Sequence, residues 1–161
     1  MSHQAHKQLE AMKIVLPEAP KPVAAYLPAI WANDLIFVSG QIPMLNGALG
    51  WRGCVPGQVS IDQAKAAARQ CALNAIAVLA DMVEGDLGRV QQIVRIGVFV
   101  ACPDDFTDQS VVANGASELF MDVFGEAGRH ARAATGASSL PLGAPVEVEV
   151  LAWAPRSDGL R

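Results

Sequence analysis

An arginine within a run of small residues is the first feature of this sequence that could do chemistry. Arg132 lies in Ala131–Ser138, where every other side chain is threonine or smaller. If this segment is an extended strand, Arg132 shares one face with Ala134, Gly136 and Ser138. Such small neighbours leave open space beside the guanidinium, whose rigid fork of donors matches a carboxylate. This pattern is typical of a site for a small anion, and a structural ion pair of Arg132 is the other interpretation.

Two glutamates follow in a segment that predicts another strand. Glu147 and Glu149 alternate with apolar residues in Val146–Trp153, and this period of two is typical of a strand. A connection that contains proline and glycine separates this strand from Ala131–Ser138, and we expect the two strands to close the domain as a pair. The glutamates could form the solvated face of the strand, or one of them could form a structural ion pair with Arg132. The spacing leaves both alternatives open.

Other residues with reactive or metal-binding side chains give weaker signals. His130 lies close to Arg132 and could line the same site or be an ordinary surface histidine. His3 and His6 could touch a metal, but we expect them to lie in a frayed tail, and we predict no metal site. The cysteines are far apart and include no Cys-x-x-Cys pair, which predicts reduced thiols. They are Cys54, Cys71 and Cys102, of which Cys71 falls on the buried stripe of a predicted helix.

The elements that must position these residues follow from caps and periodicity. Ser60 and Gln63 form a capping box that begins a helix reaching about Val83. Asp108–Phe124 predicts a second amphipathic helix, because its apolar residues recur every three or four positions. Segments of β-branched and small residues bounded by turn residues predict the strands. The predicted strands are Ala29–Trp31, Leu35–Ser39, Val90–Val100, Ala131–Ser138 and Val146–Trp153.

The order of these elements predicts an α+β fold of two layers. One mixed sheet would carry two helices on one face, and its other face would be left uncovered. A short helix over Ala5–Lys13 and a proline-rich segment form a predicted N-terminal lead-in, residues 1–21. A single domain, residues 22–155, and a short tail, residues 156–161, follow.

Composition and charge restrict the class of protein. The 161 residues are 52% hydrophobic and only 17% charged, against about 25% charged residues in typical soluble domains. So apolar a chain predicts association with copies of itself, which would cover the open sheet face. No window is long and apolar enough to span a membrane or to act as a signal core, so we expect a cytoplasmic protein. A net charge of −4 without a basic run argues against nucleic acid as a partner.

Two blocks of the sequence carry a family resemblance. In the first block, Tyr26 precedes the apolar segment Asn33–Pro43, which ends in Ser-Gly-Gln-Ile-Pro. In the second block, Arg132 is followed by Leu140-Pro141 and then by Val146–Glu149. Together these blocks resemble the RidA/YjgF family of imine and enamine deaminases. The resemblance implies a chorismate-mutase-like fold that assembles as a homotrimer with clefts between subunits.

The resemblance also implies an activity, the hydrolysis of 2-imino acids such as 2-iminopropanoate and 2-iminobutanoate to 2-keto acids and ammonia. Arg132 would hold the substrate carboxylate, Glu147 would place or deprotonate the water, and Tyr26 would flank the site. The resemblance implies no cofactor and no metal. Further hydrogen bonds that orient the substrate would come from Ser39, the Gly40 amide and Asn114.

Each of these residues also has a structural interpretation. Tyr26 could be an interface aromatic, Ser39 a cap at a strand end, and Asn114 part of a surface turn with Gly115. Many deaminating relatives carry Arg-x-Cys, whereas Ala134 stands at the position of that cysteine here, so the substrate range or rate could differ. Two other functions remain open. One is a non-catalytic trimer that binds a small carboxylate and regulates a partner, and the other is an endoribonuclease, which the acidic charge disfavours.

Overall fold

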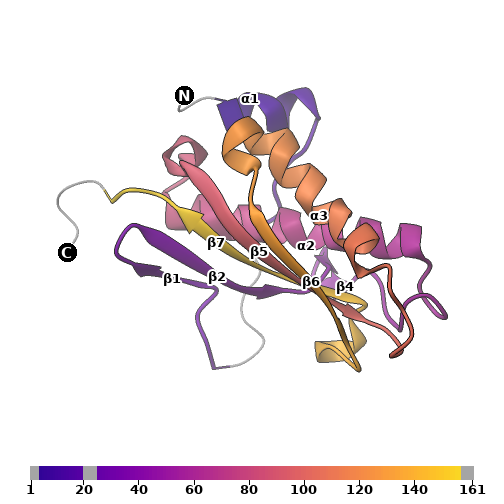
Figure 1. The fold of residues 1–161 in the computed structure, drawn as a ribbon. Helices are drawn as coiled ribbons and strands as arrows, with labels where there is room; N and C mark the ends of the chain where they lie inside the picture. The colour runs from indigo at the N-terminus through magenta and orange to yellow at the C-terminus, as the bar shows by residue number, and fades with distance from the viewer. Residues whose placement is uncertain (1–3, 20–24, 157–161) are drawn as a thin grey trace.

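The computed structural model describes residues 4–19 and 25–156, and its main sheet carries helices on one side (Figure 1). The strands of this sheet are β1 (Ala29–Ala32), β2 (Leu35–Gln41), β5 (Gln92–Ala101), β6 (Ala131–Ala137) and β7 (Val146–Trp153). They form a 5-stranded sheet in the order β1-β2-β7-β5-β6. β5 and β6 run parallel, and the other neighbouring pairs are antiparallel.

Two long helices, α2 (Ile61–Met82) and α3 (Gln109–Phe124), lie on the same face of this sheet (Figure 1). The predicted two-layer α+β fold with a mixed sheet is therefore confirmed. α2 begins at the predicted capping box. The backbone N–H of Gln63 donates to Ser60 Oγ (3.2 Å), and Gln63 Oε1 accepts from the backbone N–H of Ser60 (2.9 Å).

The two C-terminal strands are not neighbours, so their predicted pairing is wrong. β5 lies between them, parallel to β6 and antiparallel to β7. The reason is that β5, α3 and β6 form a β-α-β unit, in which the crossover helix returns the chain parallel to the first strand. β6 consequently forms one edge of the sheet.

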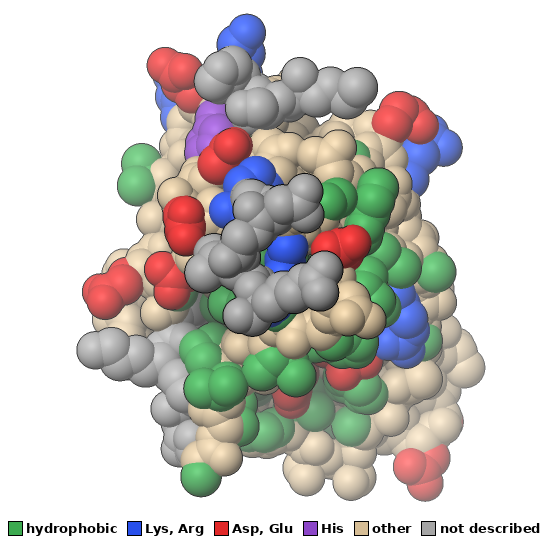
Figure 2. Space-filling view, turned by 90° about the vertical axis from the view of Figure 1, so that its left-hand side faces the viewer, with side chains coloured by type: hydrophobic (Ala, Val, Ile, Leu, Met, Phe, Trp, Pro, Cys, Tyr) green, Lys and Arg blue, Asp and Glu red, His purple; other side chains and the backbone are tan. Residues whose placement is uncertain are grey.

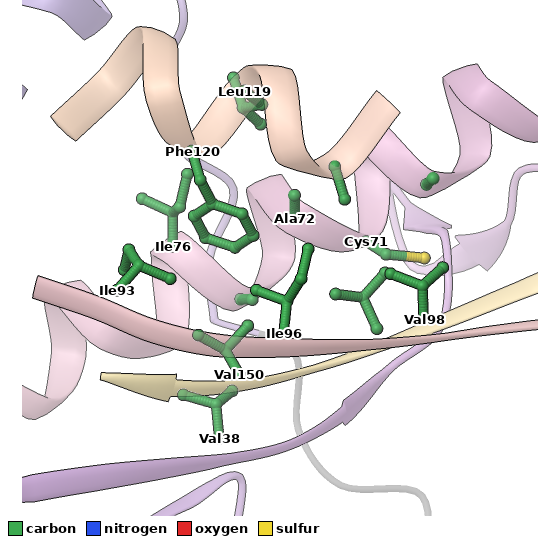
Figure 3. Close-up of a cluster of buried hydrophobic side chains, with 14 of the residues drawn as sticks. Val38, Cys71, Ala72, Ile76, Ile93, Ile96, Val98, Leu119, Phe120 and Val150 are labelled. Atoms are coloured by element: carbon green, nitrogen blue, oxygen red, sulfur yellow. The ribbon is translucent and has the colours of Figure 1, made fainter. Parts of the chain in front are cut away.

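The hydrophobic core lies between the helices and the sheet (Figure 3). Phe120 of α3 and Ile76 of α2 point from the helices toward Ile96 of β5 and Val150 of β7. Phe120, Ile76 and Ile96 are fully buried. Cys71 is also fully buried in this layer, which confirms the prediction that it is a packing residue.

The opposite face of the sheet carries no helix from the described part of the chain and displays large apolar side chains. Ile30 pairs with Phe37, and Phe37 pairs with Leu151, so these three side chains lie side by side. Ile30 is 49% exposed, and Phe37 and Trp153 are each 43% exposed. Figure 2 shows hydrophobic side chains gathered in the lower central part of one side of the molecule. We call the sheet face that carries no helix the open face. Its large apolar side chains include Ile30, Leu35, Phe37, Phe99, Leu151 and Trp153.

The N-terminal helix α1 (Gln4–Ala11) packs against α3 and buries Ala5 and Leu9. The lead-in helix is thus part of the same body as the sheet. Residues 20–24 of the proline-rich segment and residues 157–161 of the tail lie outside the described residues, and the division into lead-in, domain and tail stays a prediction. None of the helices within residues 4–19 and 25–156 is long and apolar enough to cross a membrane.

A small hairpin, β3 (Met44–Leu45) and β4 (Ala48–Leu49), follows β2. Its turn is Asn46-Gly47, where both residues have positive φ as the turns of tight hairpins require. The strands of this hairpin are too short to show a period of two. The buried Asn74 of α2 fastens the start of the hairpin, because its Nδ2 donates to the carbonyl oxygens of Ile42 and Met44 (3.1 Å each).

The packing of α3 on α2 yields a stability prediction at Gly115. A Cβ at this position would collide with the backbone carbonyl of Lys65 in α2. Overpacking of this kind costs about 1–3 kcal/mol, and alanine would gain about 1 kcal/mol over glycine in an unhindered helix. We therefore expect Gly115→Ala to lower the free energy of unfolding in chemical denaturation.

Gly57→Ala is the matched control, because a Cβ there meets no atom within 4 Å. It should change stability by less than about 0.5 kcal/mol. A Gly115→Ala variant more stable than the wild-type protein would contradict this close helix packing.

Candidate functional site

Arg132 points toward α3. Its neighbour across the parallel pair is Ile96, whose side chain lies in the core beneath the helices, and paired residues project to the same side of a sheet. Arg132 Nη1 donates to Asn114 Oδ1 (2.8 Å) and to Ser117 Oγ (3.0 Å). Nη2 reaches the carbonyl oxygen of Ser110 at a longer distance (3.4 Å). One polar side of α3 therefore holds the guanidinium.

This polar side follows helical spacing. Ser110, Asn114 and Ser117 are four and three residues apart, so they form one stripe along α3. The alternative that Asn114 and Gly115 form a surface turn is wrong, since both lie within the helix. Ser110 and Ser117 are missing from the predicted site, although their spacing from Asn114 is a signal that could have identified them.

The contacts of Arg132 leave one edge of its guanidinium available. Nη1 has two hydrogens, and Asn114 and Ser117 account for both of them. Nε has no hydrogen-bond partner among the described residues, and the Arg132 side chain is exposed. Nε and Nη2 lie side by side, and Nη2 has a second hydrogen besides the one that it donates to the Ser110 carbonyl oxygen. This edge can therefore donate two parallel hydrogen bonds to the two oxygens of a carboxylate.

His130 adjoins this arrangement through Ser117. His130 Nε2 lies 3.0 Å from Ser117 Oγ, and His130 Nδ1 lies 2.6 Å from the Gly128 carbonyl oxygen. Burial lowers the pKa of His130 below its ordinary value, the bond to Gly128 raises it in part, and the charge of Arg132 lowers it again. We call this group the arginine cluster, which comprises Asn114, Ser117, His130 and Arg132.

The small residues of β6 border open space at the far end of the strand. Ala134 and Gly136 pair with Val98 and Val100 and so share the side of Arg132, as predicted. Near Gly136 lies a cavity of about 270 Å³. The sequence predicts open space beside Arg132, but α3 covers the strand there. The open space lies instead at this cavity, near Gly136. The cavity is lined by Cys102, Pro103, Asp104, Gln109, Gly136, Ala137 and Ser138.

Glu147 lies on the open face, where β7 meets β2. A Cβ at Gly40 of β2 would collide with the Glu147 carboxylate, so the absence of a side chain there makes room for this acid. Burial raises the pKa of Glu147 above its ordinary value, and the negative charge of Glu149 raises it further. Glu147 is consequently an acid whose ionised form is poorly solvated.

Neither glutamate pairs with Arg132, so the predicted ion-pair alternative is wrong. Glu149 forms its ion pair with Arg95 of β5, with Arg95 Nη1 2.9 Å from Glu149 Oε1. Glu147 has no ion pair among the described residues. The register explains both results, because Glu147, Glu149 and Arg95 all lie on the open face, whereas Arg132 lies beneath α3.

Ser39 acts on the backbone before β1. Its Oγ donates to the Leu27 carbonyl oxygen (2.6 Å), and its backbone N–H donates to the Pro28 carbonyl oxygen (2.9 Å). Ser39 lies within β2 and not at its end, so it is not a strand-end cap; its hydroxyl instead fastens the backbone that precedes β1. Tyr26, which is 44% exposed, stands one residue before this attachment. We call the second group the glutamate cluster. Gly40 and Glu147 are its members in direct proximity, and Ser39 and Tyr26 are assigned to it only because Ser39 precedes Gly40 and Tyr26 precedes the Leu27 that Ser39 holds.

The two clusters lie on opposite faces of the sheet. Arg132 is on the edge strand β6 under α3, and Glu147 is on β7 at the open face, with β5 between these strands. Neighbouring strands are about 4.8 Å apart, so two strand spacings and the thickness of the sheet separate the two side chains. One copy of the chain therefore does not bring Arg132 and Glu147 into a common cleft.

The described residues also bear on metal binding. Residues 4–19 and 25–156 contain no group of three or more His, Cys, Asp or Glu side chains placed to hold a metal ion. His3 lies outside the described residues.

The position of Gly40 generates a prediction about Glu147. The side chain of Gly40→Ala would push the flexible Glu147 carboxylate away from β2 and into solvent, at little cost to the fold. We expect the Glu147 pKa, followed by carboxyl carbon NMR, to fall toward the ordinary glutamate value. Gly57→Ala should leave it unchanged, and an unaltered titration in Gly40→Ala would contradict the close approach of these two residues.

Comparison with known proteins places the chain in a family. The model of the YjgF/chorismate-mutase-like family matches residues 6–153. Protein TCP17 of Trypanosoma cruzi is 43% identical over 148 residues, which cover 89% of each chain. A 2-iminobutanoate/2-iminopropanoate deaminase of Dermatophagoides farinae is 27% identical over 136 residues, or 84% of this chain and 91% of that one.

Solved structures agree with this family. A protein of unknown function from Agrobacterium tumefaciens superimposes with a TM-score of 0.88 at 35% identity, covering 96% of this chain and 94% of its own. A Shewanella oneidensis protein, provisionally assigned as an endoribonuclease, has a TM-score of 0.89 at 31% identity, with coverage of 93% and 99%. The chain therefore belongs to the RidA/YjgF family, the YjgF/chorismate-mutase-like proteins.

Proposed function

We propose that this protein hydrolyses 2-imino acids, such as 2-iminopropanoate and 2-iminobutanoate, to 2-keto acids and ammonia. The observation that carries this proposal is the fixed guanidinium of Arg132, whose Nε–Nη2 edge is available to a carboxylate. A relative that bears the name of a 2-iminobutanoate/2-iminopropanoate deaminase supports the same substrate class.

The proposed site is shared between copies of the chain. A homotrimer would bury the open face and would bring the arginine cluster of one copy toward the glutamate cluster of the next. The half-exposed Phe37 and Trp153 support this assembly, because monomeric proteins rarely leave a continuous apolar patch of this kind in water. The position of Arg132 on an edge strand supports it too, since an edge is accessible to a neighbouring copy.

The proposed reaction requires an anchor and a base. Arg132 holds the substrate carboxylate, and Glu147 of the neighbouring copy accepts a proton from water as the water oxygen bonds to the imine carbon. Glu147 passes this proton to the imine nitrogen, which gives the neutral carbinolamine. The hydroxyl proton then moves to the same nitrogen as the C–N bond breaks, which releases ammonia, leaves the keto group and returns Glu147 to its ionised form. The net change consumes one water and releases one ammonia.

The proposed chemistry is modest, so placement can supply much of the rate. Imines of this type already hydrolyse in water, and holding water and substrate together removes an entropic barrier. The half-buried position of Glu147 supports its role, because a raised pKa makes a carboxylate a stronger base near neutral pH. The reaction transfers no electrons and uses only water as a second reactant, so we propose no cofactor.

The remaining predicted residues have less direct roles in this proposal. Asn114 contacts Arg132 in the structure, so we propose that it orients the anchor and, through it, the substrate. Tyr26 flanks the cleft on a segment that Ser39 fastens, and Gly40 makes room for the Glu147 carboxylate. We keep the cytoplasm as the proposed location, which the unpaired Cys54, Cys71 and Cys102 support.

Substitution of Arg132 tests the anchor. Arg132→Ala should abolish both imine hydrolysis and calorimetric binding of pyruvate or 2-oxobutanoate, because a charge-assisted hydrogen bond is worth about 1.5–3 kcal/mol. Arg132→Lys keeps the charge but loses the planar fork, so it should recover only a small part of the binding.

Arg129→Ala is the matched control for these variants. Arg129 is a neighbouring arginine whose side chain is 71% exposed and pairs with Glu126, so its loss should alter neither binding nor turnover. An Arg132→Ala protein that melts at a lower temperature yet binds the keto acid with native affinity would remove Arg132 from the site.

Substitution of the two glutamates tests the base. Glu147→Gln should retain keto-acid binding and lose turnover in semicarbazide-trapping assays with imines generated in situ. In the wild-type protein, kcat/KM should fall with decreasing pH at a pH above the ordinary glutamate pKa of about 4.3, because protonation removes the base and the Glu147 pKa is raised.

Glu149→Gln distinguishes a base from a structural acid. Removal of the Glu149 charge lowers the Glu147 pKa, so the fall in kcat/KM should move to lower pH while turnover persists. Full turnover in Glu147→Gln would contradict the proposal. Retained keto-acid binding by a wild-type protein that does not deaminate would favour a carboxylate-binding regulator instead.

Light scattering tests the shared site. We expect a stable trimer at micromolar concentration, since burial of the open face favours association at about 25 cal/mol per Å² of apolar surface. A stable monomer at the same concentration would contradict both the trimer and the shared cleft.

A further inference from the structure

A chain of hydrogen bonds runs from Arg132 through Ser117 to His130. Ser117 is 7% exposed, so its hydroxyl must find its partners within the protein. It has one partner on each side, Arg132 Nη1 at 3.0 Å and His130 Nε2 at 3.0 Å. Neither Ser117 nor His130 is among the site residues predicted from the family resemblance.

The chemistry of the outer groups fixes the direction of every bond in this chain. The Gly128 carbonyl oxygen can only accept, so the proton of neutral His130 lies on Nδ1 and Nε2 is an acceptor. Arg132 can only donate. The Ser117 hydroxyl therefore donates its hydrogen to His130 Nε2 and accepts from Arg132 Nη1 with an oxygen lone pair.

We propose that Ser117 and neutral His130 are positioning residues that hold Arg132 with its Nε–Nη2 edge toward the substrate carboxylate. His130 turns the Ser117 hydroxyl so that its lone pair faces the guanidinium, and Asn114 takes the second hydrogen of Nη1. A His130 ring with a proton on Nε2 could not accept the Ser117 hydrogen, so it would not turn the serine lone pair toward Arg132. Binding of a substrate carboxylate by the Nε–Nη2 edge rests on the proposed function. The hydrogen bonds among Arg132, Ser117 and His130 do not depend on it.

The surroundings of His130 favour the neutral form that this chain requires. The ring is packed edge-on against Phe120, with ring centroids 6.0 Å apart and an angle of 76° between the planes. Burial among such groups lowers the pKa of His130, and the guanidinium of Arg132 adds to this effect. The ring thus remains an acceptor at Nε2 at neutral pH.

Calorimetric titration with pyruvate tests the proposal through a double-mutant cycle. Ser117→Ala should weaken binding by roughly tenfold, the size expected for one hydrogen bond to a charged group. His130→Ala should weaken it by several-fold, and the double variant should bind no more weakly than Ser117→Ala alone, because His130 acts through Ser117. Ser139→Ala removes an exposed hydroxyl beyond the end of β6 and should bind like the wild-type protein.

A conservative variant separates positioning from packing. His130→Gln can place an amide oxygen near the position of Nε2 as an acceptor, and it should restore most of the affinity that His130→Ala loses. Two results would overturn the proposal. One is that the losses of pyruvate-binding free energy add in the double variant, and the other is that His130→Gln binds pyruvate as weakly as His130→Ala.

A second measurement needs no ligand. Nitrogen NMR of the wild-type protein should show His130 with its proton on Nδ1, and the Arg132 Nε–H signal should broaden in Ser117→Ala and not in Ser139→Ala. A proton on Nε2 would overturn the proposal. Native pyruvate binding by Ser117→Ala, with loss only in Arg132→Ala, would also overturn it and would leave the deaminase proposal intact. A wild-type protein that binds no pyruvate would defeat the deaminase proposal, and the NMR result would then decide the positioning role.

Discussion

The parallel pairing of β6 with β5 is the constraint on which the rest of the site depends. This pairing makes β6 an edge strand and sets Arg132 opposite Ile96, so the arginine projects toward α3 and not toward the open face. The same crossover places α3 over the strand, where Asn114 and Ser117 hold the guanidinium. A shift of one residue in this register would turn Arg132 to the other face of the sheet, and its hydrogen bonds to Asn114 and Ser117 would be lost.

Periodicity and caps predict the local elements of this protein well. The box formed by Ser60 and Gln63 and the alternation in Val146–Trp153 each depend on neighbours in the sequence, and both are present. The order of the strands depends on contacts between distant segments, so no local pattern could show that β5 separates β6 from β7. For the same reason the sequence left open whether Arg132 pairs with a glutamate, and the faces of the strands decide that it does not.

The candidate site shows the same division between local and distant information. The resemblance identifies Arg132, Asn114 and Glu147, but their grouping follows from the fold: Arg132 joins Asn114 under α3, and Glu147 joins Gly40 on the open face. Large exposed apolar side chains such as Phe37 and Trp153 on a sheet face are typical of a subunit interface. A single physical arrangement, the meeting of two copies, would cover that face and complete the site.

The most direct measurement mixes two inactive variants, Arg132→Ala and Glu147→Gln. Each copy of one variant retains the cluster that the other lacks, so a site formed between unlike copies can contain both an intact Arg132 and an intact Glu147. The two proteins are unfolded together, refolded, and assayed for imine hydrolysis, with mass spectrometry to verify mixed assemblies. A shared site predicts that hydrolysis reappears in the mixture and not in either variant refolded alone. Mixed assemblies without activity would contradict a site built from two copies of this chain.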